Sequence, residues 1–118
     1  MVSKLLDAGD PSPVVVQRAN AQSPFVLICD HAGDAVPSRL AQLGLSDHDM
    51  SRHIAWDIGA LGVAKGLSEA LDAPLIWQQY SRLVVDCNRP HGHSGLVIEH
   101  SEATPIPGNQ NLDPGAVD

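Results

Sequence analysis

Short apolar runs rich in β-branched residues predict four strands. The runs cover residues 14–16, 25–29, 75–77 and 83–87. The second run is apolar throughout, a pattern typical of a strand that is covered on both faces of a sheet. Only residues 78–82 separate the last two runs, so these runs are expected either to form a hairpin or to be one bent strand.

A helical pattern lies between the second and third runs. Pro37 opens a short helical turn, and Ser46 is a good N-cap because acidic residues follow it in the first turn. Residues 72–74, which include a proline, end the pattern. Apolar residues at spacings of three and four predict one buried helix face, formed by Ile54, Ile58, Leu61, Ala64, Leu67 and Leu71.

Glycines interrupt this helix and need a structural reason. Gly59, Gly62 and Gly66 each cost about 1 kcal/mol relative to alanine in a helix. Close packing of the helix against a sheet would explain them. The order strand, helix, strand, strand then predicts an α/β fold, with a partial mixed sheet flanked by helices. Residues 1–118 are expected to be one domain, in which residues 91–118 form a loop-rich tail.

Composition and charge exclude several classes of protein. The 118 residues are 43% hydrophobic and 18% charged, which is a globular balance. With 7 basic and 14 acidic residues, the chain lacks the clustered positive charge that nucleic-acid binding requires. It also has no apolar run long enough for a membrane span and no signal-peptide pattern. Cys29 and Cys87 lie in apolar runs and are expected to be buried free thiols, which favours a cytoplasmic location.

The first candidate site follows the second apolar run. His31 and Asp34 lie three positions apart where the chain leaves the carboxyl end of a strand, the place where ligands bind in open α/β sheets. An imidazole nitrogen and a carboxylate oxygen at this spacing can hold one metal ion. Alternatively, Asp34 caps the turn at Pro37 and His31 is only hydrogen-bonded.

The second candidate site is the pair His53 and Asp57. These residues lie four apart, so on a helix they share one face. The pair could bind a metal ion, or the carboxylate could orient the imidazole for proton transfer. A solvated pair on a helix surface is the alternative.

The third candidate site lies in the fourth apolar run. On an extended strand Arg82, Asp86 and Asn88 fall on one face, which indicates a shared polar site. The guanidinium group of Arg82 or Arg89 suits a substrate carboxylate that is held by two hydrogen bonds. The alternative is a buried Arg82–Asp86 ion pair, which is compatible with a functional site.

Two further interpretations are weaker. Cys29 lies two residues before His31, but a thiol nucleophile needs a third, orienting group, and this thiol is expected to point into the core. His91 and His93 form a short tract that resembles a metal-binding segment, although a solvated loop has the same composition.

Three of these motifs occur together in a known family. Residues 30–33 (DHAG), 52–60 (RHIAWDIGA) and 81–90 (SRLVVDCNRP), in this order, resemble the N-formylglutamate amidohydrolase family, and residues 104–109 are similar to one of its loops. The resemblance covers residues 12–118. It implies a metal-dependent amide hydrolase that releases formate from N-formyl-L-glutamate in histidine breakdown. It also implies a fold similar to the zinc carboxypeptidases and the aspartoacylase group, of the phosphorylase/hydrolase-like kind.

The resemblance also assigns roles to residues. It implies that His31 and Asp34 bind a divalent metal ion, and the expected metal is zinc. It implies that Asn88 and Arg89, with Arg82 and Asp86, bind the carboxylate of a small N-acyl amino acid. His53 and Asp57 match polar positions of the family, and we predict that they act in catalysis.

The length of the chain modifies this expectation. Members of the family are more than twice as long, and their second half supplies a further metal-binding histidine and the catalytic acid or base. We therefore expect this sequence to be a truncated amidohydrolase. The alternatives are a non-catalytic remnant that binds a carboxylate ligand and a thiol hydrolase. An uncovered sheet edge would also favour a homo-oligomer.

Overall fold

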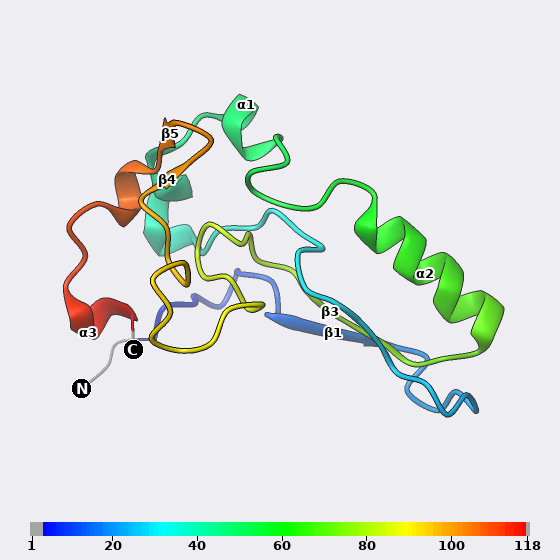
Figure 1. Cartoon of the computed structure of the whole chain (residues 1–118). Coiled ribbons are helices and arrows are strands. Elements are labelled where there is room, and N and C mark those ends of the chain that lie inside the picture. Colours follow the sequence, from blue (N-terminus) through cyan, green and yellow to red (C-terminus); the bar gives the residue numbers. More distant parts are fainter. Residues whose placement is uncertain (1–3, 118) are drawn as a thin grey trace.

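The computed structural model, which describes residues 4–117, has an arm and a lobe (Figure 1). The arm is a three-stranded sheet with one long helix, and the lobe consists mostly of turns and short helices. The arm contains β1 (Val14–Gln17), β2 (Leu27–Cys29), β3 (Leu75–Gln78) and α2 (Ala60–Leu71). The lobe contains η1 (Ser38–Gly44), α1 (Asp47–Met50), β4 (His100–Ser101), β5 (Thr104–Pro105), η2 (Pro107–Asn109) and α3 (Pro114–Val117).

The sheet has the order β1-β3-β2 and is mixed. Strand β3 pairs with β1 in antiparallel and with β2 in parallel orientation, and α2 provides the crossover that parallel strands need. Inward residues of the sheet, among them Leu75 and Trp77, pack against Leu61 and Ala64 of α2. The expected strands at residues 14–16 and 75–77 and the mixed α/β fold are therefore confirmed.

A second apolar core holds the lobe together. Leu43, Leu83 and Ile106 are almost fully buried in it, although they come from distant parts of the sequence. The side-chain amide of Asn109 donates to the carbonyl groups of Leu83 and Ile98 at 2.8 and 2.9 Å. Part of the predicted tail, including Ile106, therefore belongs to the core of the lobe.

The expectation for residues 25–29 was wrong in one respect. Strand β2 is at the edge of the sheet, and the side chain of Ile28 is 72% exposed. Among the described residues, α2 covers one face of the sheet only, so outward apolar side chains on β2 remain in solvent. The expected burial of both cysteines also fails, because Cys29 is buried and Cys87 is exposed.

The predicted strand at residues 83–87 is absent from the described structure. Residues 82–84 form turns instead, with the amide of Val84 donating to the carbonyl of Ser81 at 3.0 Å. The hydroxyl of Ser81 donates to the carbonyl of Ala55 and accepts from the amide of Leu83. Leu83 is buried by the core of the lobe rather than by a sheet, and Val85 is exposed, so both the hairpin and the bent strand were wrong.

The helix begins later than its apolar spacing predicts. Helix α2 starts at Ala60, after Gly59 with a φ of 86°. The segment that contains Ile54 and Ile58 forms turns, because the carbonyl of Ala55 accepts hydrogen bonds from Ser81 and Arg82 rather than from the next helical turn. The predicted end of the helix and the N-cap at Ser46 are confirmed, since Ser46 accepts a hydrogen bond from the amide of Asp49 at 3.1 Å.

The glycines of α2 do not touch the sheet. A Cβ atom at Gly62 or Gly66 would meet no other heavy atom within 4 Å, so close helix–sheet packing is not their reason. We expect Gly66→Ala to raise the free energy of unfolding by about 0.5–1 kcal/mol, because alanine restricts the unfolded chain and favours the helix. Gly59→Ala is the control: at a φ of 86° it should destabilise the protein. Urea denaturation followed by circular dichroism measures both, and equal effects would contradict the explanation.

None of the helices within residues 4–117 combines the length and the apolar character that crossing a membrane requires.

Candidate functional site

His31 lies in the turn after β2 and is 8% exposed, and two carboxylates contact its ring. Its Nε2 atom is 2.7 Å from Oδ1 of Asp86, and its Nδ1 atom is 3.3 Å from Oδ2 of Asp57. The backbone reinforces this arrangement, since the amide of Asp57 donates to the carbonyl of His31 at 2.9 Å. The imidazole is therefore fixed at the carboxyl end of β2, where the sequence predicted a ligand site.

Asp86 joins the imidazole to the arginines. Its carboxylate also accepts from Nη2 of Arg82 at 3.2 Å and from the amide of Asn88 at 3.0 Å, and Nε of Arg89 lies 3.9 Å away. Burial alone would raise the pKa of Asp86, but the hydrogen bonds from His31 and Asn88 and the charges of His31 and Arg82 bring that pKa below its ordinary value. Asp86 is thus an ionised, buried anchor for the groups around it.

The guanidinium groups of the two arginines differ in the contacts that they make with carboxylates. Arg82 contacts Asp86 and also Oδ1 of Asp57 at 3.4 Å, so both ends of its guanidinium fork are occupied. Among the described residues, the ion pair of Arg89 is the long contact with Asp86, and its side chain is 48% exposed. Arg82 and Asp86 come together through a turn rather than along one face of a strand, so the predicted ion pair exists but the predicted geometry was wrong.

A groove of about 650 Å³ adjoins this cluster. His31, Asp57 and Asn88 line its polar end. Apolar residues line the rest of it, between the edge of β2 and the outer side of α2: Ile28, Ile58, Val63 and Leu67. The groove can therefore receive a molecule with a polar head beside the imidazole.

His53 lies apart from this cluster. Residues 51–56 form turns and bends, so His53 and Asp57 do not share a helix face, and that prediction was wrong. His53 is exposed, and its Nε2 atom contacts Oε1 of Glu102 at 2.8 Å. The hydrogen bond from His53 lowers the pKa of Glu102, and the charges of His53 and Arg52 act in the same direction. His53 thus helps to attach the β4–β5 hairpin to the rest of the lobe.

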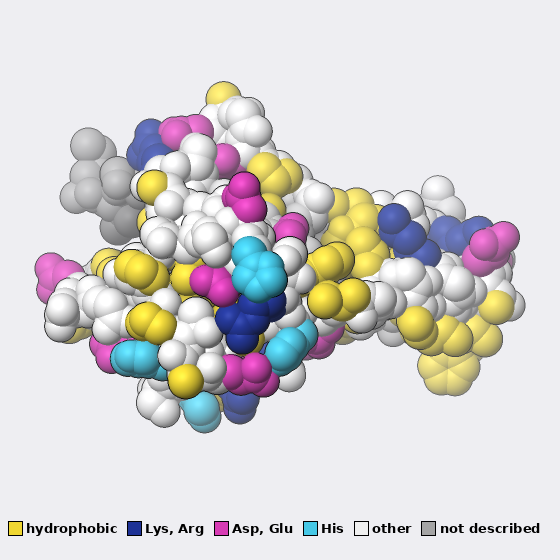
Figure 2. Space-filling view, turned by 90° about the horizontal axis from the view of Figure 1, so that it is seen from above, with side chains coloured by type: hydrophobic (Ala, Val, Ile, Leu, Met, Phe, Trp, Pro, Cys, Tyr) yellow, Lys and Arg dark blue, Asp and Glu magenta, His cyan; other side chains and the backbone are white. Residues whose placement is uncertain are grey.

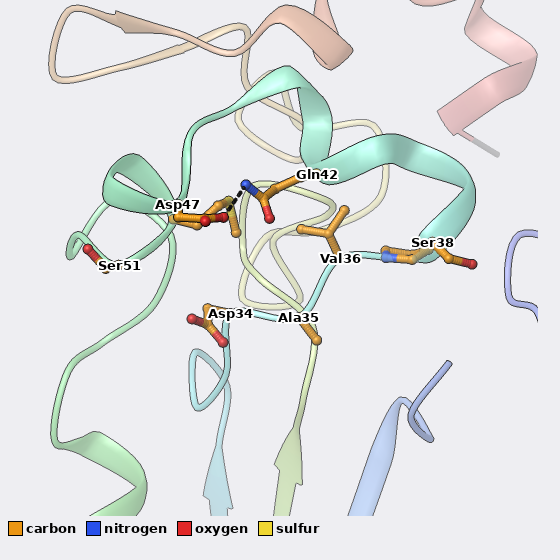
Figure 3. Close-up of a pocket in the computed structure, with 9 residues that line it drawn as sticks. Asp34, Ala35, Val36, Ser38, Gln42, Asp47 and Ser51 are labelled. Carbon is orange, nitrogen blue, oxygen red and sulfur yellow. Dashed lines mark hydrogen bonds between the residues drawn. The ribbon is translucent and has the colours of Figure 1, made fainter. Parts of the chain in front are cut away.

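Asp34 faces a different cavity. This pocket of about 440 Å³ is also lined by Gln42 and Asp47, and Nε2 of Gln42 donates to Oδ1 of Asp47 at 3.0 Å (Figure 3). Asp34 lies at its wall, whereas His31 lines the groove beside α2. The structure therefore groups His31 with Asp57 and Asp86 and leaves Asp34 in the other pocket.

The environment of Cys29 opposes thiol catalysis. Burial raises the pKa of the Cys29 thiol, and the negative charges of Asp30 and Asp57 raise it further. A nucleophilic thiol needs the opposite shift, toward the thiolate.

Sequence reasoning missed the contacts that organise the site. Asp57 binds His31 across 26 positions, and Glu102 binds His53 across 49. No local spacing signals such pairs, because each depends on how the lobe folds. Asp86, by contrast, carried a signal of its own, as a carboxylate within an apolar run.

Comparisons with known proteins place this arrangement in a family. The family model described as N-formylglutamate amidohydrolase matches residues 23–116. The crystal structure of a gene product from Agrobacterium tumefaciens is similar, with 41% sequence identity and a TM-score of 0.92. That match covers 96% of this chain and 45% of the Agrobacterium protein, so this chain spans about half the length of that relative. Curated proteins give no match. The chain belongs to the N-formylglutamate amidohydrolase family.

Proposed function

We propose that this chain supplies the substrate-carboxylate side of an amide-hydrolase site for N-formylglutamate or a similar N-acyl amino acid. The observation that carries the proposal is the convergence of His31, Arg82 and Arg89 on the buried carboxylate of Asp86. Family membership supports amide hydrolysis as the reaction. We also propose that the fold is a version of the zinc-carboxypeptidase and aspartoacylase fold.

Arg89 is the residue that we assign to the substrate. Its guanidinium group is half-exposed and has one long contact, so it can form two hydrogen bonds with a carboxylate at small cost. Asn88 lines the groove next to it. Arg82 is held by Asp57 and Asp86, and we assign it the role of keeping these carboxylates in place. Asp86, buried behind them, then positions the other groups and does not touch substrate.

An imidazole nitrogen and a carboxylate oxygen are donor types that a divalent metal ion such as zinc binds. Nδ1 of His31 and Oδ2 of Asp57 are 3.3 Å apart, which is roughly the separation of two ligands on a tetrahedral zinc ion. The Asp86 carboxylate at Nε2 is the outer partner that metal-binding histidines typically have. We therefore propose Asp57, rather than Asp34, as the donor beside His31.

The number of donors is smaller than catalytic zinc requires. Within residues 4–117 no group of three or more histidine, cysteine or acidic side chains is placed to hold a metal ion, and catalytic zinc takes three protein ligands. When bound, such an ion would polarise the formyl carbonyl group and activate a water molecule. The shortage favours a second candidate function, binding of a carboxylate ligand without hydrolysis.

Titration with N-formyl-L-glutamate tests the proposal. In the presence of Zn²⁺ we expect calorimetry to detect binding, and Arg89→Gln to weaken it by about tenfold or more, because a charge-assisted pair is lost. Arg18→Gln is the control, since Arg18 pairs with Asp72 on the surface of the arm. Equal affinity of the wild type and Arg89→Gln would contradict the assignment. Proton NMR of the formyl group in the same samples separates the two functions, because only a hydrolase releases formate.

A further inference from the structure

The groups of the candidate site come from three separate segments of the chain. His31 lies in the turn after β2, Asp57 lies in the segment before α2, and Arg82 lies in the turns after β3. Asp57 is 50% exposed, and its distances to His31 and Arg82 are 3.3 and 3.4 Å. Figure 2 shows histidine and charged side chains gathered on the surface of the lobe, where water competes for such contacts. Buried hydrogen bonds therefore decide how the three segments are spaced.

Ser81 joins its own segment to the other two from inside the lobe. It is fully buried, with 0% of its surface exposed. Its hydroxyl donates to the carbonyl of Ala55 at 2.7 Å, two residues before Asp57. Its backbone amide donates at 2.7 Å to the carbonyl of Ala35, in the segment that follows His31. One residue thus connects the backbones that carry the imidazole and the carboxylate.

The hydroxyl of Ser81 also shapes the turn that carries Arg82. It accepts a hydrogen bond from the amide of Leu83 at 3.1 Å, and the carbonyl of Ser81 accepts one from the amide of Val84 at 3.0 Å. The amide of Arg82 donates at 3.2 Å to the same carbonyl of Ala55 that the hydroxyl contacts. Every polar group of Ser81 is engaged within the protein, so this residue acts through its neighbours and not on a substrate.

We propose that Ser81 is a positioning residue of the candidate site, whose hydroxyl sets the spacing of Asp57 and Arg82 and thereby keeps Asp57 beside the imidazole of His31. An alanine at this position would leave the buried amide of Leu83 without its acceptor, and the two segments could then shift relative to one another. The consequence for substrate affinity rests on the proposed function, whereas the consequence for the imidazole does not.

Ser68 provides a matched control. It is also a buried serine, 1% exposed, and its hydroxyl donates at 2.6 Å to the carbonyl of Ala73, beyond the end of α2. Ser68→Ala therefore removes a comparable buried hydrogen bond in the arm. A serine with a merely structural role would behave like Ser68, so the difference between the two alanine variants isolates positioning from stability.

Nitrogen-15 NMR of the protein without substrate or metal is the first measurement, because the ring nitrogens of His31 report on their contacts with carboxylates. We expect Ser81→Ala to shift these ring signals well beyond any shift that Ser68→Ala produces. Ser81→Cys makes weaker hydrogen bonds from a similar side chain, so it should shift the signals in the same direction by less. It replaces the alanine variant if that variant does not fold, which circular dichroism establishes.

Calorimetry with N-formyl-L-glutamate and Zn²⁺ is the second measurement. Ser81→Ala should weaken the affinity by about tenfold, because small displacements of positioned groups are costly. Ser68→Ala should leave the affinity unchanged.

The two measurements separate the positioning role from the proposed function. Ring signals of His31 that move in Ser81→Ala and not in Ser68→Ala would support the positioning role. They would do so even if the wild type binds no N-formyl-L-glutamate, a result that contradicts only the proposed function. Signals that move equally in both variants, or in neither, would overturn the positioning role. Wild-type affinity of Ser81→Ala, where the wild type binds, would overturn it as well.

Discussion

Replacing Asp86 with alanine is expected to lower the free energy of unfolding by about 3–5 kcal/mol, the largest loss we expect from a polar residue of this chain. The carboxylate is 7% exposed and lies 2.7 Å from Nε2 of His31 and 3.2 Å from Nη2 of Arg82. Its removal leaves a buried imidazole without the partner of its shorter contact and a guanidinium group with one partner fewer. Urea denaturation at neutral pH measures the loss.

Asp57 provides the matched control. It contacts the same two residues, at 3.3 and 3.4 Å, but its side chain is 50% exposed. Water can replace these contacts, so Asp57→Ala should cost about 1 kcal/mol or less. Equal losses in the two alanine variants would show that burial does not make Asp86 the anchor of the cluster.

The pH dependence of stability provides a second readout for Asp86. Its folded-state pKa is below the ordinary value, so the carboxylate stabilises the fold fully above about pH 4. This contribution is lost as the pH falls through the depressed pKa of the folded protein. In Asp86→Asn the corresponding part of the acid-induced loss should be missing, since the amide does not titrate. An unchanged acid profile would contradict the ionised state of Asp86.

The parts of the fold that follow from the sequence are those with local causes. The N-cap at Ser46 depends on a hydrogen bond to a residue three positions away, and it is present. The apolar run before Asp86 was misread because apolar residues are buried equally by a sheet and by an irregular core. Leu83 packs in the lobe with Ile106 and with apolar residues of 43–55, and only the fold of these distant segments creates that environment.

The candidate site was predictable residue by residue, but its connections were not. His31, Arg82, Asp86 and Arg89 were each selected for chemistry that polar groups beside apolar runs can perform, and the structure brings these four together. Asp34 and His53 carried equally good local patterns, yet one lines another pocket and the other pairs with Glu102. Long-range contacts decide between such patterns, and a spacing rule contains no information about them.

Adding a methyl group at Gly33 is expected to disrupt the backbone of the turn that carries His31. An added Cβ would overlap the carbonyl oxygen of Gln79 and lie 2.9 Å from its carbonyl carbon. That oxygen accepts a hydrogen bond from the amide of Ala35 at 3.2 Å, and the carbonyl of Ala35 accepts one from Ser81 at 2.7 Å. These bonds fix the turn that carries His31 against the segment that leads to Asp86.

Gly33→Ala should therefore destabilise the protein by about 3 kcal/mol, because the obstructing atoms are backbone and can move only with the chain. Gly62→Ala, where a Cβ meets nothing within 4 Å, should be neutral or stabilising. If Gly33→Ala remains folded at low temperature, its affinity for N-formylglutamate should fall while that of Gly62→Ala does not, since only the first displaces His31 from Asp86. A free energy of unfolding for Gly33→Ala within about 0.5 kcal/mol of the wild-type value would contradict this explanation. It would mean that the turn is not tied to Gln79 and that His31 is held by its side-chain contacts alone.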